Sequence, residues 1–229
     1  MPSDWPVALA FLLGLLAVFA IAIFVGLRMR RQRTSELLQN VNADTVWNEF
    51  SRFSQPPDGS WERNDLLYGI WQDFSATSLG MIIRNGQDSA VARVSYGVTG
   101  VDISLGENRY KVRLGNNLQG TAVLSQDSGN GEETAGLCTF SRKGWFQNRA
   151  VEYSSSDIGV LRISLPWGSP FKSFLATITK DGEPVGKMGT IGRPYFNNGR
   201  VLILPAALPE PIRVFVMAWG TGPAGVRYN

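Results

Sequence analysis

The chain has 229 residues, which is enough for one membrane segment and one soluble domain of ordinary size. It contains no histidine and a single cysteine, Cys138, which excludes histidine acid–base catalysis, histidine-ligated metal or haem, and an internal disulfide. The formal net charge is +3. Four arginines just after an apolar segment account for the excess: without them and Asp4, residues 34–229 carry 18 basic and 18 acidic side chains. A nucleic-acid-binding domain carries a basic face of its own, so no nucleic-acid partner is expected.

Residues 7–27 predict a transmembrane helix. These 21 residues contain no charged or hydrogen-bonding side chain, and as a helix they span about 31 Å, the thickness of a hydrocarbon core. The alternative is a cleaved signal peptide. The run is longer than a typical signal-peptide core, no Lys or Arg precedes it, and no small-x-small cleavage site closes it. A retained single span surrounded by membrane lipid is therefore expected.

The flanking charges predict the orientation of this span. The positive-inside rule counts Lys and Arg beside a span, and here they occur only after it. We therefore expect residues 1–6 to form a short outer N-terminus and the rest to lie in the cytoplasm, with the span in the inner cell membrane. The topology-determining residues at the membrane edge are Arg28, Arg30, Arg31 and Arg33.

Residues 28–60 are expected to form a basic juxtamembrane segment followed by an amphipathic helix over 34–54. Thr34 and Ser35 are candidate N-caps, and apolar residues recur at helical spacing behind them. The apolar stripe can pack on its own domain, lie on the membrane or face a partner; packing on its own domain is the default. The Pro-Pro-Asp-Gly sequence at 56–59 ends the helix.

From residue 61 onward the sequence predicts a cytoplasmic all-β domain, an antiparallel barrel or sandwich. Short apolar or alternating runs are separated by turn sequences such as Asn85-Gly86 and Asp181-Gly182, at spacings of about 8–12 residues. No long helical pattern alternates with them, which argues against a βαβ fold. The predicted strands are 66–74, 79–83, 90–98, 101–105, 109–114, 121–125, 137–141, 150–153, 159–165, 174–179, 184–191 and 200–204.

The segments 174–187, 200–205 and 212–219 resemble the closing hairpins and terminal segment of tubby C-terminal-like domains, a group that includes scramblase-like and LURP-one-related proteins. This resemblance covers at most residues 90–220. It implies a closed barrel around a central hydrophobic C-terminal helix, often membrane-associated. The chain departs from the pattern where Pro205, Pro209 and Pro211 crowd the start of that helix, so 212–219 is open between a short helix and a final strand. No lipid or ligand site is carried over.

The motifs predict no catalytic residue, no cofactor and no metal site. Cys138 has no histidine to activate it and is expected to be a small buried hydrophobe. The acidic segment 127–134 lacks the ligand spacing of a calcium loop and is interpreted as a solvated turn. Aromatic residues in loops, and Trp47 in the stripe of the expected helix, suggest partner docking, with core packing as the alternative. These docking candidates are Trp47, Trp145, Phe146, Trp167 and Phe171.

Together these features predict a non-catalytic accessory or scaffolding subunit of a multisubunit membrane complex. Its partners would be integral membrane subunits, and a photosynthetic reaction-centre or antenna assembly or a respiratory complex is the expected kind of host. The layout, though no motif, is similar to that of the H subunit of purple-bacterial reaction centres. The alternative is a membrane-anchored β-barrel module that binds a lipid or another apolar ligand.

Overall fold

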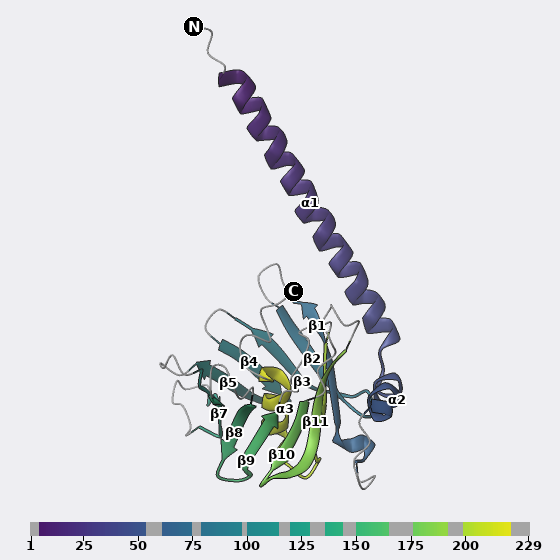
Figure 1. Ribbon diagram of the computed structural model, residues 1–229, viewed down its shortest axis with the longest axis vertical. Helices are drawn as coiled ribbons and strands as arrows, with labels where there is room; N and C mark the ends of the chain where they lie inside the picture. Colours follow the sequence, from purple (N-terminus) through teal and green to yellow (C-terminus); the bar gives the residue numbers. More distant parts are fainter. Residues whose placement is uncertain are drawn as a thin grey trace. The chain divides into compact units, whose positions relative to one another are not determined.

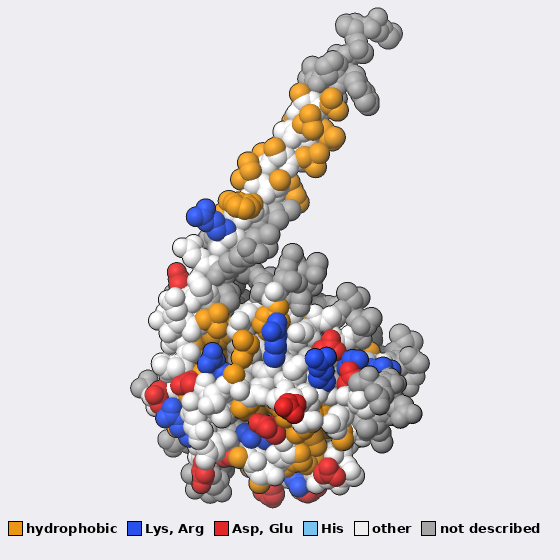
Figure 2. Space-filling model, turned by 180° about the vertical axis from the view of Figure 1, so that it is seen from behind, with side chains coloured by type: hydrophobic (Ala, Val, Ile, Leu, Met, Phe, Trp, Pro, Cys, Tyr) orange, Lys and Arg blue, Asp and Glu red, His pale blue; other side chains and the backbone are white. Residues whose placement is uncertain are grey.

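A computed structural model describes residues 5–53, 61–74, 79–97, 100–114, 120–128, 136–143, 150–164, 176–191 and 199–220. The chain divides into two compact units, residues 1–40 and 41–229. The first unit contains the single helix α1 (Trp5–Asn40). Within it, Leu9–Gly26 is long and apolar enough to cross a membrane. Its large side chains, such as Phe11 at 73% exposure, are solvent-accessible all around the helix, as a lipid-facing helix requires (Figure 2).

The predicted helix over 34–54 is wrong at its start. α1 continues through Thr34 and Ser35 to Asn40, and a separate helix α2 (Ala43–Phe53) follows. The N-cap of α2 is Asn42: its Oδ1 accepts the Thr45 N–H at 2.9 Å, and Thr45 Oγ1 accepts the Asn42 N–H at 3.0 Å. This reciprocal pairing satisfies two backbone donors at the start of a helix.

The second unit is built on a closed antiparallel barrel of twelve strands in the described part of the chain (Figure 1). Each strand pairs with its neighbours in sequence, and the first strand pairs with the last. All twelve predicted runs correspond to strands, with ends shifted by up to two residues. The strands are β1 (Leu66–Asp73), β2 (Leu79–Asn85), β3 (Ala90–Tyr96), β4 (Gly100–Leu105), β5 (Asn108–Leu114), β6 (Ala122–Gln126), β7 (Cys138–Lys143), β8 (Ala150–Ser155), β9 (Gly159–Ser164), β10 (Ala176–Lys180), β11 (Glu183–Ile191) and β12 (Gly199–Ile203).

Alternation along the strands separates the lumen from the outer surface. In β9, Leu161 and Ile163 are buried in the lumen, and Val160 and Arg162, which alternate with them, are exposed. Asp181-Gly182 joins β10 to β11 with φ values of 53° and 91°, the left-handed conformation that a two-residue hairpin requires. The barrel, not the sandwich, is therefore the correct form of the predicted all-β domain.

The lumen is filled by a C-terminal helix, α3 (Glu210–Trp219), which lies inside the ring of strands (Figure 1). Every residue from Ile212 to Trp219 is buried. Pro209 is the N-cap and Pro211 lies in the first turn, where the missing N–H has no helical partner, so these prolines begin the helix and do not block it. Segment 212–219, open between helix and strand, is a helix.

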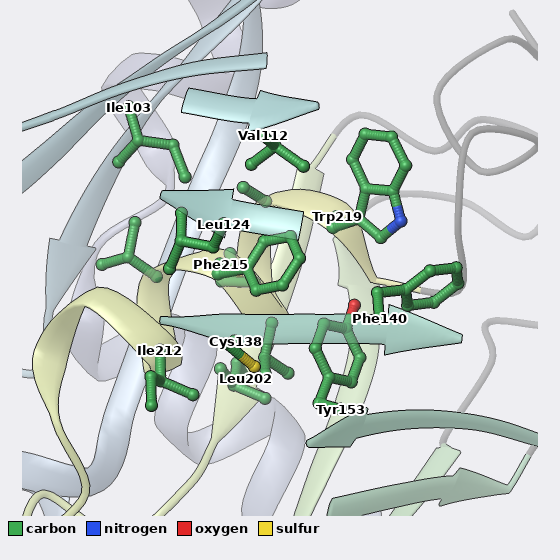
Figure 3. Close-up of a cluster of buried hydrophobic side chains, with 14 of the residues drawn as sticks. Ile103, Val112, Leu124, Cys138, Phe140, Tyr153, Leu202, Ile212, Phe215 and Trp219 are labelled. Atoms are coloured by element: carbon green, nitrogen blue, oxygen red, sulfur yellow. The ribbon is translucent and has the colours of Figure 1, made fainter. Parts of the chain in front are cut away.

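The residues around α3 form one continuous apolar core. Figure 3 shows Phe215 and Trp219 of α3 beside Phe140 of β7 and Tyr153 of β8. The ring centroids of Tyr153 and Phe215 are 5.2 Å apart in an edge-on arrangement, and those of Phe140 and Trp219 are 6.0 Å apart. Such pairs add to the stabilisation that burial of the rings provides.

The outer face of the barrel carries a second, smaller apolar cluster under α2. Ala43 and Val46 of α2 pack against four outward residues of the first and last strands, with Trp47 partly buried at the edge. The expected packing of this helix on its own domain is confirmed. We call the four barrel residues the seam strip: Leu66, Tyr68, Val201 and Ile203.

Truncation of Phe215 tests the role of α3 as the core of the barrel. Phe215 is 0% exposed, so Phe215→Ala removes a fully buried ring and should lower the free energy of unfolding by about 3–5 kcal/mol. Val160→Ala, at a position 43% exposed on the outer face, is the control and should change it by less than about 0.5 kcal/mol. Urea unfolding followed by tryptophan fluorescence measures both. Equal effects of the two variants would show that α3 is not part of the core.

Candidate functional site

The end of the barrel at which α3 finishes is distinguished by its connections. Because the strands run antiparallel in sequence order, every odd-numbered strand ends here and every even-numbered strand begins here. Four of the six connections at this end have six residues or more, and the one between β9 and β10 has 11. At the opposite end, three of the five connections have two or three residues. We call the first end the loop end.

Three buried side chains hold the C-terminus of α3 at the loop end. Arg200 Nη1 donates to the carbonyls of Met217 at 3.0 Å and of Ala218 at 2.6 Å. The Tyr96 hydroxyl donates to the Ala218 carbonyl at 2.7 Å, and the Tyr153 hydroxyl donates to the Gly220 carbonyl. The last carbonyls of a helix have no partner within it, so these donors satisfy groups that would otherwise be buried unpaired. We call Arg200, Tyr96 and Tyr153 the clamp.

Arg200 is a buried cation, 4% exposed, and no carboxylate of the described residues forms an ion pair with it. Its charge lies against the negative end of the α3 dipole, which favours a cation. The guanidinium also lies over the Trp71 ring, 5.2 Å from its centroid. Space here is limited: a Cβ on Gly220, where φ is 61°, would lie 2.8 Å from Arg200 Nη1. Position 220 therefore requires glycine.

The clamp tyrosines act as neutral donors. Burial raises the pKa of Tyr96 and of Tyr153 well above the ordinary value, and the nearby Arg200 charge opposes this shift only in part. Both hydroxyls therefore keep their protons at physiological pH, which the donated hydrogen bonds require.

The start of α3 is held at the opposite end of the barrel by Arg213 and Asp65. Arg213 Nη2 donates to the carbonyls of Asn64 at 3.3 Å and of Asp65 at 3.0 Å. The Asp65 carboxylate in turn accepts the N–H of Ala206 at 2.8 Å and of Glu62 at 2.9 Å. Burial lowers the pKa of Arg213, although Asp65 and Glu210 oppose the shift. The polar groups at both ends of α3 thus hold the helix in place.

An open surface groove lies at the loop end, beside the β3–β4 connection. Its volume is about 410 Å³, and its lining includes Gly97, Asp102 and Arg113. Lys111, also in the lining, forms an ion pair with Asp127 at 2.8 Å, and that contact raises the pKa of the lysine. The groove therefore presents both charge signs. The barrel face in Figure 2 likewise mixes basic and acidic side chains.

The structure brings together few of the sequence-predicted site residues. Arg28 is exposed on α1, and Arg30, Arg31 and Arg33 lie on the same helix with side chains outside the described set. Trp47 is half-buried against the cluster under α2, which places it against its own barrel. The remaining four docking candidates lie outside the described residues, but the strand ends that flank them, β7–β8 and β9–β10, are at the loop end. Those four candidates are Trp145, Phe146, Trp167 and Phe171.

Sequence reasoning missed the clamp. Arg200 follows Gly199 at the start of an apolar run, where an arginine is expected to point outward at a strand end. The sequence did carry one signal: Arg200 is the only charged residue in the run 200–204, where every other side chain is apolar.

Cys138, the one cysteine of the chain, is not a nucleophile at neutral pH. Burial raises the pKa of the Cys138 thiol to about 12, so the thiolate is scarce. Among the described residues, no group of three His, Cys, Asp or Glu side chains could hold a metal ion. Comparisons with protein-family models, with curated proteins and with solved structures give no match for this chain.

Replacing Arg200 tests the clamp. Arg200→Met keeps an unbranched, flexible side chain but leaves the Met217 carbonyl without its donor, and should lower the free energy of unfolding by about 3 kcal/mol. Arg162→Met is the matched control, because Arg162 is exposed and pairs with Glu152 at 3.2 Å on the outer face. It should cost about 0.5 kcal/mol or less. A loss for Arg200→Met no larger than that of the control, measured by urea unfolding, would contradict the clamp.

The raised thiol pKa predicts a pH dependence of stability. The unfolded thiol loses its proton near pH 8.5, whereas the folded one holds it to about 12. The contribution of the Cys138 thiol to the free energy of unfolding is therefore fully present below about pH 8.5. It falls as the pH rises above this value, by up to about 1.4 kcal/mol per pH unit. Tyr96 and Tyr153 add to the fall above about pH 10. Unfolding free energies between pH 7 and 10.5 should show this slope, and Cys138→Ala should flatten it between pH 8.5 and 10. An unchanged slope in that variant would refute the assignment.

Proposed function

We propose that this chain is a non-catalytic accessory subunit of a membrane complex, anchored by α1 and docking through the loop end of its barrel. The observation that carries the proposal is the occupation of the lumen by α3. Ile212 to Trp219 are all buried there, so the interior space in which barrels usually hold a ligand is used for the protein's own core. Recognition is left to the outer surface.

The anchor supports the membrane half of the proposal. Leu9–Gly26 is exposed on every side of α1, and a helix that is apolar all round needs lipid or other helices around it. The arginines that follow the span lead us to propose a cytoplasmic position for the barrel.

The buried polar groups support the non-catalytic half. Arg200, Tyr96 and Tyr153 donate to main-chain carbonyls of α3 and its cap, and Arg213 donates to main-chain carbonyls before β1. These contacts hold the fold, and catalysis would need such groups aimed at a substrate instead.

The loop end is the face we propose for docking. It combines four connections of six residues or more, an open groove of mixed charge and the strand ends that flank four loop aromatics. Aromatic side chains supply much of the energy at protein interfaces. The alternative expected from the sequence, a barrel that carries an apolar molecule, would need lumen space that α3 takes up.

Isolation of the tagged full-length chain from its native membranes in mild detergent tests the proposal. We expect integral membrane proteins to co-purify at a fixed stoichiometry. Replacement of Trp145, Phe146, Trp167 and Phe171 together by Ser should abolish their recovery, whereas Val160→Ser on the outer strand face should not. The quadruple variant must first show wild-type thermal unfolding. A lone chain carrying one lipid per barrel in native mass spectrometry would support the carrier instead. Undiminished recovery of the co-purifying proteins with the quadruple variant would show that the loop end is not the docking face.

A further inference from the structure

Helix α2 lies across the junction between the first and last strands of the barrel. Its Ala43 and Val46 cover the seam strip, whose residues come from β1 and β12. Several outward positions on other strands are polar or charged, for example Arg93, Asp102 and Arg162, whereas Val160 is an apolar side chain exposed on β9. The seam strip differs in that its four apolar residues are buried, and the short amphipathic helix of this same chain covers them.

A polar latch fastens the N-terminus of α2 to the barrel. Asp88 Oδ1, in the β2–β3 turn, accepts the Ala43 N–H at 2.7 Å and the Tyr68 hydroxyl. Asp44 of α2 pairs with Arg63 at 2.6 Å, and Arg63 Nε donates to the Gly86 carbonyl at 2.6 Å. A carboxylate at the first N–H of a helix is favoured by the helix dipole as well as by the hydrogen bond.

The strand pairing that closes the barrel does not include α2. β1 and β12 pair directly through five residue pairs, from Leu66–Ile203 to Ile70–Gly199. The lumen core around α3 is a separate cluster from the one under α2. An 11-residue helix is too short to be stable alone in water, so α2 depends on the barrel for its structure while the barrel closes without it.

Docking of α2 sets the length of free chain between the two units. With α2 docked, only residues 41 and 42 separate α1 from α2, and both are held: Val41 packs on the cluster and Asn42 caps the helix. With α2 released, residues 41–53 add to the free chain, and these thirteen residues can extend to roughly 45 Å, compared with about 7 Å for two residues.

We propose that α2 is a releasable strap that sets how far the barrel can move from its anchor. In the docked state the strap keeps the barrel on a two-residue tether. Release of the seam strip and the Asp88 latch lengthens the tether about sixfold, with the barrel intact. The proposal rests on the membrane anchoring given under the proposed function, but not on the identity of any partner.

Hydrogen exchange on the full chain in lipid nanodiscs tests the strap. The amides of α2 should exchange at least a hundredfold faster than those of β12 and α3, because they open without the barrel. Asp88→Gly deletes the latch carboxylate at a residue whose φ is 62°, so glycine adds no backbone strain, and it should speed α2 exchange roughly tenfold.

Asp88→Asn keeps an acceptor oxygen and should restore most of the protection. Asp157→Gly, in the β8–β9 turn, is the control and should leave α2 unchanged. Two results would overturn the proposal: amides of α2 that exchange at the same rate as those of β1 and β12, or an Asp88→Gly variant in which the strands lose as much protection as α2. Either result would show that α2 unfolds together with the barrel.

A distance measurement gives an independent readout. Spin labels at Gln39→Cys in α1 and Ser154→Cys in β8 sit at exposed positions, while the buried Cys138 stays unlabelled. Pulsed dipolar spectroscopy should give a broader distance distribution, extending to longer distances, for Asp88→Gly with Val46→Ala than for the parent chain. Identical distributions would contradict a tether set by α2. If these measurements contradict the strap, the expected co-purification of partner subunits is unaffected. The two proposals can therefore fail separately.

Discussion

The packing of α3 inside the barrel is the constraint on which the rest of the structure depends. The width of a barrel grows with its number of strands, and eight strands already leave an interior that side chains just fill. A twelve-stranded barrel therefore needs additional material in its lumen, and the buried face of α3, from Ile212 to Trp219, supplies it. Burial of a helix creates a second requirement, because its terminal backbone groups lose water. Arg200 with two tyrosines at one end, and Pro209 and Pro211 at the other, meet that requirement.

The same constraint bears on function. A lumen filled by the protein's own helix leaves little interior for a ligand, and the buried cations are engaged with main-chain carbonyls. The outer surface and the loop end are then the parts available for recognition. This is the basis of the docking role that we propose for the loop end.

The two short helices of the second unit differ in how they are attached. α3 is surrounded by the lumen core, and its loss would remove the centre of the fold. α2 lies on the outside, over the seam strip, and is attached through one small cluster and the latch at Asp88. Elements with few buried contacts open at lower free energy than the core does. Because α2 directly follows α1 in the chain, its opening would lengthen the tether between the anchor and the barrel, as we propose.

The sequence by itself determined the features that depend on local chemistry: an apolar helix near the N-terminus and twelve strands marked by alternation and turn residues such as Asp181-Gly182. Only the tertiary structure decided the rest. Segment 212–219 is apolar except for Arg213, so it has no periodicity from which to choose helix or strand; the surrounding barrel makes the choice by burying it on all sides. Arg200 points inward because the negative end of α3 lies there, a partner 17 residues away that no local pattern reveals. The start of α2 was partly predictable. Asn42 and Thr45 form a capping pair that the sequence contains, but the apolar spacing continues across this position and hid the break between the two helices.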